Sequence, residues 1–168
     1  ISPMTSNEYI LAYKEFMKND DVMFVSEHRG SYDNKEELKD YVSKNLDIIL
    51  FPISITRFEA QKAKIILEKE GFKIGIANIL WIKPFSIKKE WKDAIKTSKF
   101  GGIVLDDDYE EGVATNLAFE LMKATGKKID TMGLKKRSAG FSKFSDNLPP
   151  NENEIVERVK KILNSKEN

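Results

Sequence analysis

Residues 101–126 read GGIVLDDDYEEGVATNLAFELMKATG, and this stretch decides the expected fold. Within it, residues 102–105 form a short apolar run, which is typical of a buried strand. Farther along, apolar residues recur at helical spacing, and these are Ala114, Leu117, Ala118, Leu121 and Met122. A buried strand followed by a helix with one apolar face is the repeating unit of an α/β protein.

Between the predicted strand and helix, five of the six residues from Asp106 to Glu111 are carboxylates. Acidic residues stabilise a helix N-terminus, which carries unpaired N–H groups and a partial positive charge. The position just beyond the carboxyl end of a strand is also where ligands bind in open α/β sheets. The sequence leaves both interpretations open. Residues 106–108 lack the alternating ligand spacing of a calcium loop, so no metal site is predicted.

The flanking segments repeat the alternation of strand and helix. Further strands are expected at residues 48–51, 73–82 and 128–132, and further helices are expected to begin at Ser54 or Thr56, at Ser86 and at Asn151. Residues 47–168 therefore predict a three-layer α/β/α sandwich around a mainly parallel, mixed sheet.

The first 33 residues supply one helix, with Thr5 and Glu8 at capping-box spacing, and one short strand at residues 22–25. Such a pair cannot bury a core by itself, so we interpret residues 1–33 as the end of another domain. The charged stretch 34–46 is expected to be a linker. Because the chain begins with Ile1 and not with methionine, we expect a processed chain or a piece of a larger protein.

The bulk composition narrows the classes of partner. The 168 residues carry a net charge of +1, which lacks the basic footprint of a nucleic-acid-binding protein. No apolar run approaches the roughly 20 residues that span a bilayer, and no signal peptide is recognised, so no membrane partner is expected. The absence of cysteine excludes disulfides and thiolate chemistry and fits a cytoplasmic protein.

The motifs of a self-sufficient active site are missing, including the dinucleotide fingerprint, the phosphate loop and the nucleophile elbow. His28, the one histidine, is interpreted as a plain loop residue in preference to a catalytic one. Residues 133–150 form a long loop in which Lys135, Lys136 and Arg137 accompany two phenylalanines. Such a mixture also binds phosphates, but we favour a solvated or subunit-contacting loop.

The order of these pieces resembles the C-terminal domain of the transketolase family. Four stretches carry the resemblance, at residues 47–50, 68–71, 77–85 and 103–112. The third is similar to the family's Asn-Leu-Arg-Thr-Ile-Lys-Pro-Leu-Asp run, and the fourth is similar to its Val-Glu-Glu-Gly-Tyr turn. Upstream, Ser2-Pro3 and residues 21–33 resemble the end of the family's pyrimidine-binding domain. The residues of these motifs are most similar to those of the beta subunit of thiamine-diphosphate-dependent 2-oxo acid dehydrogenases.

The sequence also departs from the family's pattern. Leu80 and Trp81 stand where the family has an arginine and a small hydroxyl residue, and Asp108 replaces a glycine. The run that starts at Arg137 replaces an Asp-x-Pro-x-Pro-Tyr loop. The resemblance therefore assigns no ligand role to these positions.

The resemblance implies an oxidoreductase or transferase that uses thiamine diphosphate and Mg²⁺, held between a pyrophosphate-binding and a pyrimidine-binding domain. This sequence lacks the family's Gly-Asp-Gly…Asn-Asn motif, so residues 1–168 are expected neither to bind the cofactor nor to catalyse alone. Expected partners are the rest of the same enzyme, including an alpha subunit, and a second copy in a homodimer. The candidate interface or anion-contacting residues are Asp106, Asp107, Asp108, Gly112, Lys135, Lys136 and Arg137.

Two alternatives stay open. One is the C-terminal domain of a deoxyxylulose-phosphate synthase or a sugar transketolase. The other is a stand-alone α/β module that binds a small anion.

Overall fold

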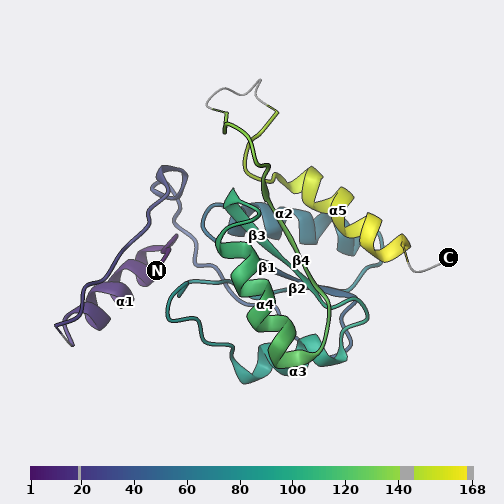
Figure 1. Cartoon of the computed structure of the whole chain (residues 1–168), viewed down its shortest axis with the longest axis horizontal. Coiled ribbons are helices and arrows are strands. Elements are labelled where there is room, and N and C mark those ends of the chain that lie inside the picture. Colours follow the sequence, from purple (N-terminus) through teal and green to yellow (C-terminus); the bar gives the residue numbers. More distant parts are fainter. Residues whose placement is uncertain (19, 141–145, 166–168) are drawn as a thin grey trace.

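A parallel sheet forms the centre of the protein. The computed structural model describes residues 1–18, 20–140 and 146–165. Four strands pair in the order β2-β1-β3-β4, and every pairing between them is parallel (Figure 1). They are β1 (Ile48–Pro52), β2 (Ile74–Ile76), β3 (Gly102–Tyr109) and β4 (Ile129–Leu134).

Helices cover both faces of this sheet. On one face lie α2 (Thr56–Lys69) and α5 (Glu152–Asn164), and on the other lie α3 (Lys89–Thr97) and α4 (Val113–Thr125) (Figure 1). Neighbouring residues of β1 face opposite layers, since Leu50 packs with α2 and α5 whereas Phe51 packs with α3 and α4. Every residue of β1 is buried, which explains its unbroken apolar run. The predicted three-layer sandwich is confirmed.

The prediction of a mainly parallel sheet is confirmed, since its four strands pair only in parallel. Among the described residues, antiparallel pairing is limited to an isolated bridge between Tyr41 and Ile76. This bridge covers the outer edge of β2, where the segment predicted as a linker runs along the strand.

Two glycines permit the tight turns that connect the strands to the helices. Gly126 ends α4 with φ of +71°, a left-handed conformation that suits glycine. Gly101 has φ of +73°, and a Cβ atom there would lie 1.9 Å from the carbonyl oxygen of Lys128. The β3–β4 pairing therefore requires glycine at position 101 for two independent reasons.

Several predicted boundaries are wrong. The strand expected at 73–82 extends only from Ile74 to Ile76, although the N–H groups of Ala77 and Ile79 still donate to carbonyls of Leu50 and Pro52 beside it. The helix expected to begin at Ser86 begins at Lys89, without a side-chain cap.

Neither Ser54 nor Thr56 caps α2. Ile55 occupies the N-cap position, and the Thr56 hydroxyl donates instead to backbone oxygens of Ile53 and Leu105. The last helix starts as predicted, because Asn151 and Glu154 form a complete capping box.

An N-terminal unit lies to one side of the sandwich (Figure 1). It contains α1 (Ser6–Phe16) and a short 3₁₀ turn, η1 (Arg29–Ser31). The prediction of a sheet strand at residues 22–25 is wrong. Within the described residues, this segment bonds through the carbonyl of Phe24 to the amino group of Ile1 and joins no strand of the sheet. Among the helices described here, none has both the length and the apolar character needed to span a membrane.

Candidate functional site

The first three acids of the run, Asp106 to Asp108, belong to β3, which corrects the prediction that they lie in a turn, whereas Glu110 and Glu111 lie in the turn before α4 as predicted. Residues 106–108 continue the strand as far as Tyr109, and Gly112 is the N-cap residue of α4, whose first turn contains no acid. The strand stays extended because β4 runs beside it, with Tyr109 paired to Leu134 after an irregularity in register. The neighbouring strand therefore determines the positions of Asp106, Asp107 and Asp108, and the helix dipole does not.

Asp106 is the most perturbed of these carboxylates. Its side chain is only 3 % exposed, and its Oδ1 accepts the N–H of Asp108. Its Oδ2 has no hydrogen-bond partner within the described part of the chain. Burial, together with the negative charges of Asp107 and Asp108, raises the pKa of Asp106 to about 6.

Asp107 joins the carboxyl ends of β1 and β3. Its Oδ2 accepts a hydrogen bond of 2.7 Å from the hydroxyl of Ser54, a residue held at φ of +51°. The helices that follow these two strands lie on opposite faces of the sheet, so this is the topological switch point where α/β folds usually bind ligands. In this protein, the hydrogen bond between Ser54 and Asp107 spans the switch point.

Within the described part of the basic loop, three cations have acidic partners. Lys135 pairs with Glu110 at 3.0 Å, and Lys136 pairs with Glu111 at 3.0 Å. Arg137 pairs with Asp146 at 2.7 Å.

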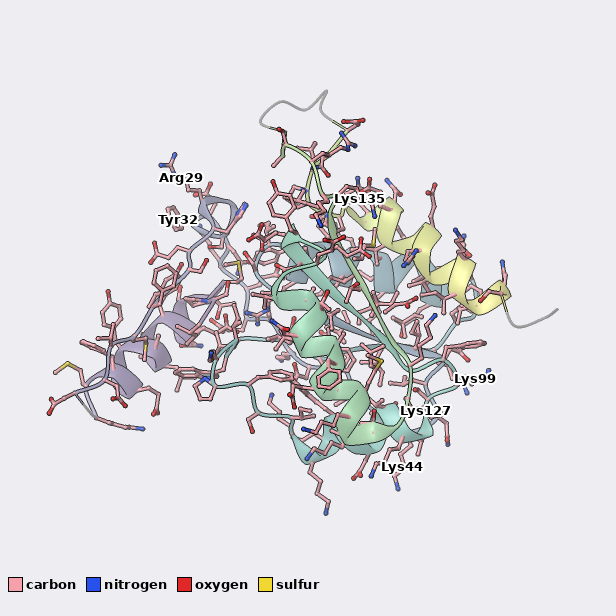
Figure 2. The ribbon with its side chains drawn as sticks, viewed as in Figure 1. Arg29, Tyr32, Lys44, Lys99, Lys127 and Lys135 are labelled. Carbon is pink, nitrogen blue, oxygen red and sulfur yellow. The ribbon has the colours of Figure 1, made fainter. Side chains whose placement is uncertain are left out.

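The loop approaches the acidic run at the end of the sheet. A cavity of about 400 Å³ is lined by three predicted contact residues, Gly112, Lys136 and Arg137, together with Tyr109, Glu111 and Leu134. Figure 2 shows Lys135 at this end of the molecule and Lys44, Lys99 and Lys127 at the opposite end. The two phenylalanines of the loop, at positions 141 and 144, lie outside the described residues.

The His28 side chain caps the 3₁₀ turn that follows it. Its Nδ1 accepts the N–H of Gly30 at 3.0 Å, which caps η1. Within the described residues, no three histidine, cysteine or acidic side chains are grouped so as to hold a metal ion.

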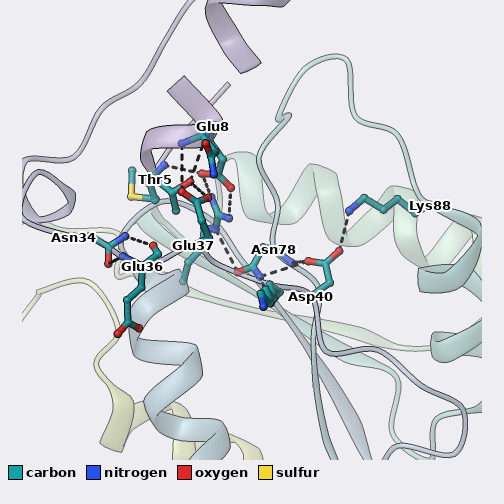
Figure 3. A network of polar contacts seen from close by, with 12 residues as sticks. Thr5, Glu8, Asn34, Glu36, Glu37, Asp40, Asn78 and Lys88 are labelled. Carbon is teal, nitrogen blue, oxygen red and sulfur yellow. Dashed lines mark hydrogen bonds and ion pairs between the residues drawn. The ribbon is translucent and has the colours of Figure 1, made fainter. Parts of the chain in front are cut away.

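A buried ion pair joins the N-terminal unit to the sandwich, and local sequence patterns did not indicate it (Figure 3). Arg57, in the first turn of α2, is 1 % exposed and donates both terminal nitrogens to the two carboxylate oxygens of Glu8 on α1. Its Nε also donates to Oδ1 of Asn78. The spacing of Thr5 and Glu8 predicts a capping box, but it gives no signal of a partner for Glu8 that lies 49 residues away.

The segment 34–46 is fastened to both parts by further polar contacts (Figure 3). Glu37 accepts the hydroxyl of Thr5 at 2.6 Å. Asp40 accepts the N–H of Asn78 at 2.8 Å and the indole N–H of Trp91 at 3.0 Å. These bonds tie the N-terminal unit, the connecting segment and the sheet into one network.

The N-terminal unit exposes many apolar side chains despite this attachment. The most exposed are Val22 at 98 %, Phe24 at 82 %, Met17 at 79 % and Tyr13 at 71 %. A groove of about 840 Å³ continues from this unit toward α4, and its apolar walls include Phe24, Trp81, Pro84 and Val113. Monomeric proteins rarely expose contiguous apolar surface of this kind, so the surface marks a contact region.

Comparison with known proteins identifies the fold. No known family profile matches the chain, and no curated protein does. A split-gene transketolase, described as an inactive beta4 tetramer, is similar with a TM-score of 0.68 at 14 % identity. The match covers 96 % of this chain and 56 % of that chain. The fold is that of a transketolase C-terminal-like domain.

A second structure has a similar fold. A 2-oxoglutarate:ferredoxin oxidoreductase from Magnetococcus marinus has a TM-score of 0.54 at 19 % identity, over 78 % of this chain and 20 % of that one. The present chain thus spans 56 % of the split-gene transketolase chain and a much smaller share of the oxidoreductase.

The described residues of this transketolase C-terminal-like domain do not fit thiamine diphosphate and Mg²⁺. They contain no metal-ligating cluster, and the three cations of the described part of the basic loop are each paired with a carboxylate.

Proposed function

We propose that this chain is the C-terminal part of a thiamine-diphosphate-dependent enzyme, of the type of the beta subunit of 2-oxo acid dehydrogenases. In this proposal it contributes domain and subunit contacts in a cytoplasmic assembly and does not complete the catalytic site by itself. Residues 1–33 are the end of a pyrimidine-binding domain, and residues 47–168 are the transketolase C-terminal-like domain.

One observation carries the proposal. The N-terminal unit leaves its apolar side chains exposed, yet a buried arginine–carboxylate pair fixes it to the domain. A unit of one helix and one extended segment lacks a core of its own, so its apolar surface requires further protein to cover it. The match over 96 % of the chain includes this unit, which supports assigning it to the same kind of enzyme.

The proposal is tested by isothermal titration and turnover. Thiamine diphosphate with Mg²⁺ should not bind tightly to the purified chain. Adding the polypeptides that supply the pyrophosphate-binding domain and the rest of the pyrimidine-binding domain should produce a complex that binds the cofactor and oxidises a 2-oxo acid with ferricyanide as acceptor. Micromolar cofactor binding or turnover by the chain alone would refute the proposed division of labour.

The sugar-converting relatives are the first alternative. A reading frame that continues upstream into a fused Gly-Asp-Gly domain favours a synthase or a transketolase, whereas a separate neighbouring gene favours the two-subunit dehydrogenase.

A stand-alone anion-binding module is the second alternative, and the cavity beside Lys136 and Arg137 is the observation that favours it. Against it, both cations have carboxylate partners at 3.0 Å and 2.7 Å. Titration with inorganic phosphate tests this alternative, and we expect no saturable binding below millimolar concentration.

A further inference from the structure

The cavity at the carboxyl end of the sheet has both apolar and charged walls. Its volume of about 400 Å³ lies in the range of small-molecule sites. Leu134, the last residue of β4, is buried, and Tyr109, the last residue of β3, is half-exposed. These two side chains supply apolar surface, whereas Glu111 and Lys136 bring opposite charges to the same lining. The cavity therefore offers contacts to an apolar group and to charges of both signs.

The ion pair between Glu111 and Lys136 is the part of this lining that a ligand can open. Oε2 of Glu111 and Nζ of Lys136 lie 3.0 Å apart, and the two side chains are 68 % and 83 % exposed. Exposed pairs contribute little to stability, because water already screens their charges. Both residues also line a second cavity of about 230 Å³, so the pair borders free space in two places. Separating the two charges therefore costs little if each of them finds a new partner.

The basic side of the cavity favours an anionic group. Arg137 lines the cavity beside Lys136, and its partner Asp146 is 83 % exposed. Gly112, which also lines the cavity, is the N-cap residue of α4, and no side chain caps this end of the helix. The start of a helix attracts negative charge, which adds to the effect of the two cations. A carboxylate is therefore a suitable group for this side.

The opposite charges on the lining favour a ligand that carries both signs of charge. A simple anion would replace the carboxylate partner of Lys136 and would gain nothing from Glu111. A zwitterion would replace one ion pair with two, because its carboxylate pairs with Lys136 and its ammonium group pairs with Glu111. An α-amino acid holds its two charges on a single carbon atom, so it matches two opposite charges that lie close together.

We propose that this cavity binds an α-amino acid with an apolar side chain. The ligand carboxylate pairs with Lys136, the ammonium group pairs with Glu111, and the side chain packs on Tyr109 and Leu134. This inference goes beyond the proposed function and does not rest on it, since every residue of the site belongs to the sandwich.

Isothermal titration of the full chain with L-leucine tests the proposal. We expect saturable binding with a dissociation constant of about 1 mM or lower, as suits a ligand of this size. N-acetyl-L-leucine lacks the cation and L-leucine amide lacks the anion, so each should bind at least about tenfold more weakly. Glycine lacks the apolar side chain and should also bind at least about tenfold more weakly.

Glu111→Gln removes the proposed partner of the ammonium group and keeps the size of the side chain. It should weaken leucine binding at least about tenfold and should change N-acetyl-L-leucine binding by less than about threefold, because that compound has no cation to pair. Glu157→Gln, at an exposed position of α5, is the matched control and should leave leucine binding within about threefold. Urea denaturation should give the same stability for both variants, since both positions are exposed.

Each other outcome overturns a defined part of the inference. If leucine shows no saturable binding, the site is overturned and the proposed function, which the cofactor titration tests separately, stays intact. Equal binding of leucine and N-acetyl-L-leucine, or equal leucine binding by the Glu111→Gln variant, overturns the role of the ion pair. Glycine that binds as tightly as leucine overturns the apolar contact. Inorganic phosphate that binds as tightly as leucine overturns the zwitterion in favour of a simple anion site.

Discussion

The guanidinium of Arg57 meets the carboxylate of Glu8 through both terminal nitrogens, across 49 residues of sequence. The arginine is 1 % exposed, and the Glu8 side chain is 14 % exposed. Among the ion pairs of the described residues, this pair has the most buried side chains. Its removal is therefore the most direct way to separate the two parts.

Glu8→Ala should lower the free energy of unfolding by about 3 kcal/mol, because it leaves the buried arginine without a counter-charge. Urea denaturation at pH 7 measures the effect. Replacing both members with apolar residues, as in Glu8→Leu with Arg57→Met, should cost much less than Glu8→Ala alone. Glu15→Ala, which breaks an exposed pair with Lys18, is the control and should cost less than about 1 kcal/mol. Equal losses for Glu8→Ala and Glu15→Ala would show that burial does not strengthen the contact.

Asp106→Asn should change how stability depends on pH. The folded-state pKa of Asp106 is raised from 3.8 to about 6, so the folded state holds this proton more strongly than the unfolded state does. The contribution of Asp106 to stability is therefore greatest below pH 4 and is lost as the pH rises through about 6. A difference of about two pKa units corresponds to about 3 kcal/mol.

The Asp106→Asn variant should thus be more stable than the unsubstituted chain at pH 8, and the difference should shrink as the pH falls toward 4. Urea denaturation at half-unit pH intervals measures it. Glu120→Gln, on the exposed face of α4, is a charge-matched control without this trend. A difference that is constant across pH would contradict the raised pKa of Asp106.

Asn147→Ala should loosen the basic loop without unfolding the sheet. Asn147 is 2 % exposed, and its side chain bonds the N–H of Lys135 and the carbonyls of Lys135, Arg137 and Ser138. Losing these bonds should cost about 1–3 kcal/mol locally and speed amide exchange at Lys135. Exchange in β1 should be unchanged, as it should be throughout in the exposed Asn153→Ala control. Faster exchange in β1 would mean that the loop and the sheet unfold together.

Gly101→Ala and Gly126→Ala separate steric conflict from backbone strain. Both glycines have φ near +70°, but a Cβ at 101 would lie 1.9 Å from a carbonyl oxygen, whereas a Cβ at 126 would meet nothing within 4 Å. The Gly126→Ala variant should lose about 1 kcal/mol and remain folded. The Gly101→Ala variant should lose several times as much, because the β3–β4 pairing must move. Similar losses in thermal denaturation would mean that this turn relaxes freely.

Much of the fold could be predicted because local patterns determined it. The helical spacing from Ala114 to Met122 located α4, and the consecutive apolar residues of β1 indicated a strand covered on both faces. Asn151 and Glu154 marked the start of α5, because a capping box depends only on residues three apart.

The site could not be predicted from local patterns because its geometry depends on distant residues. Residues 106–108 were predicted in a turn, but β4 holds them in a strand by pairing Leu134 with Tyr109. Arg57 and Glu8 lie in separate helices, and neither has a neighbour in sequence that indicates the other. The hydroxyl of Thr56 gave a valid capping pattern, yet the backbone of β3 offered it another acceptor.

The placement of Arg57 in the first turn of α2 has a mechanical consequence. Force applied to α1 by a bound protein would pass through Glu8 to the amino end of α2, and from there to the adjoining end of β1. A protein that binds α1 would therefore transmit force to the end of the sheet where Ser54 bonds Asp107.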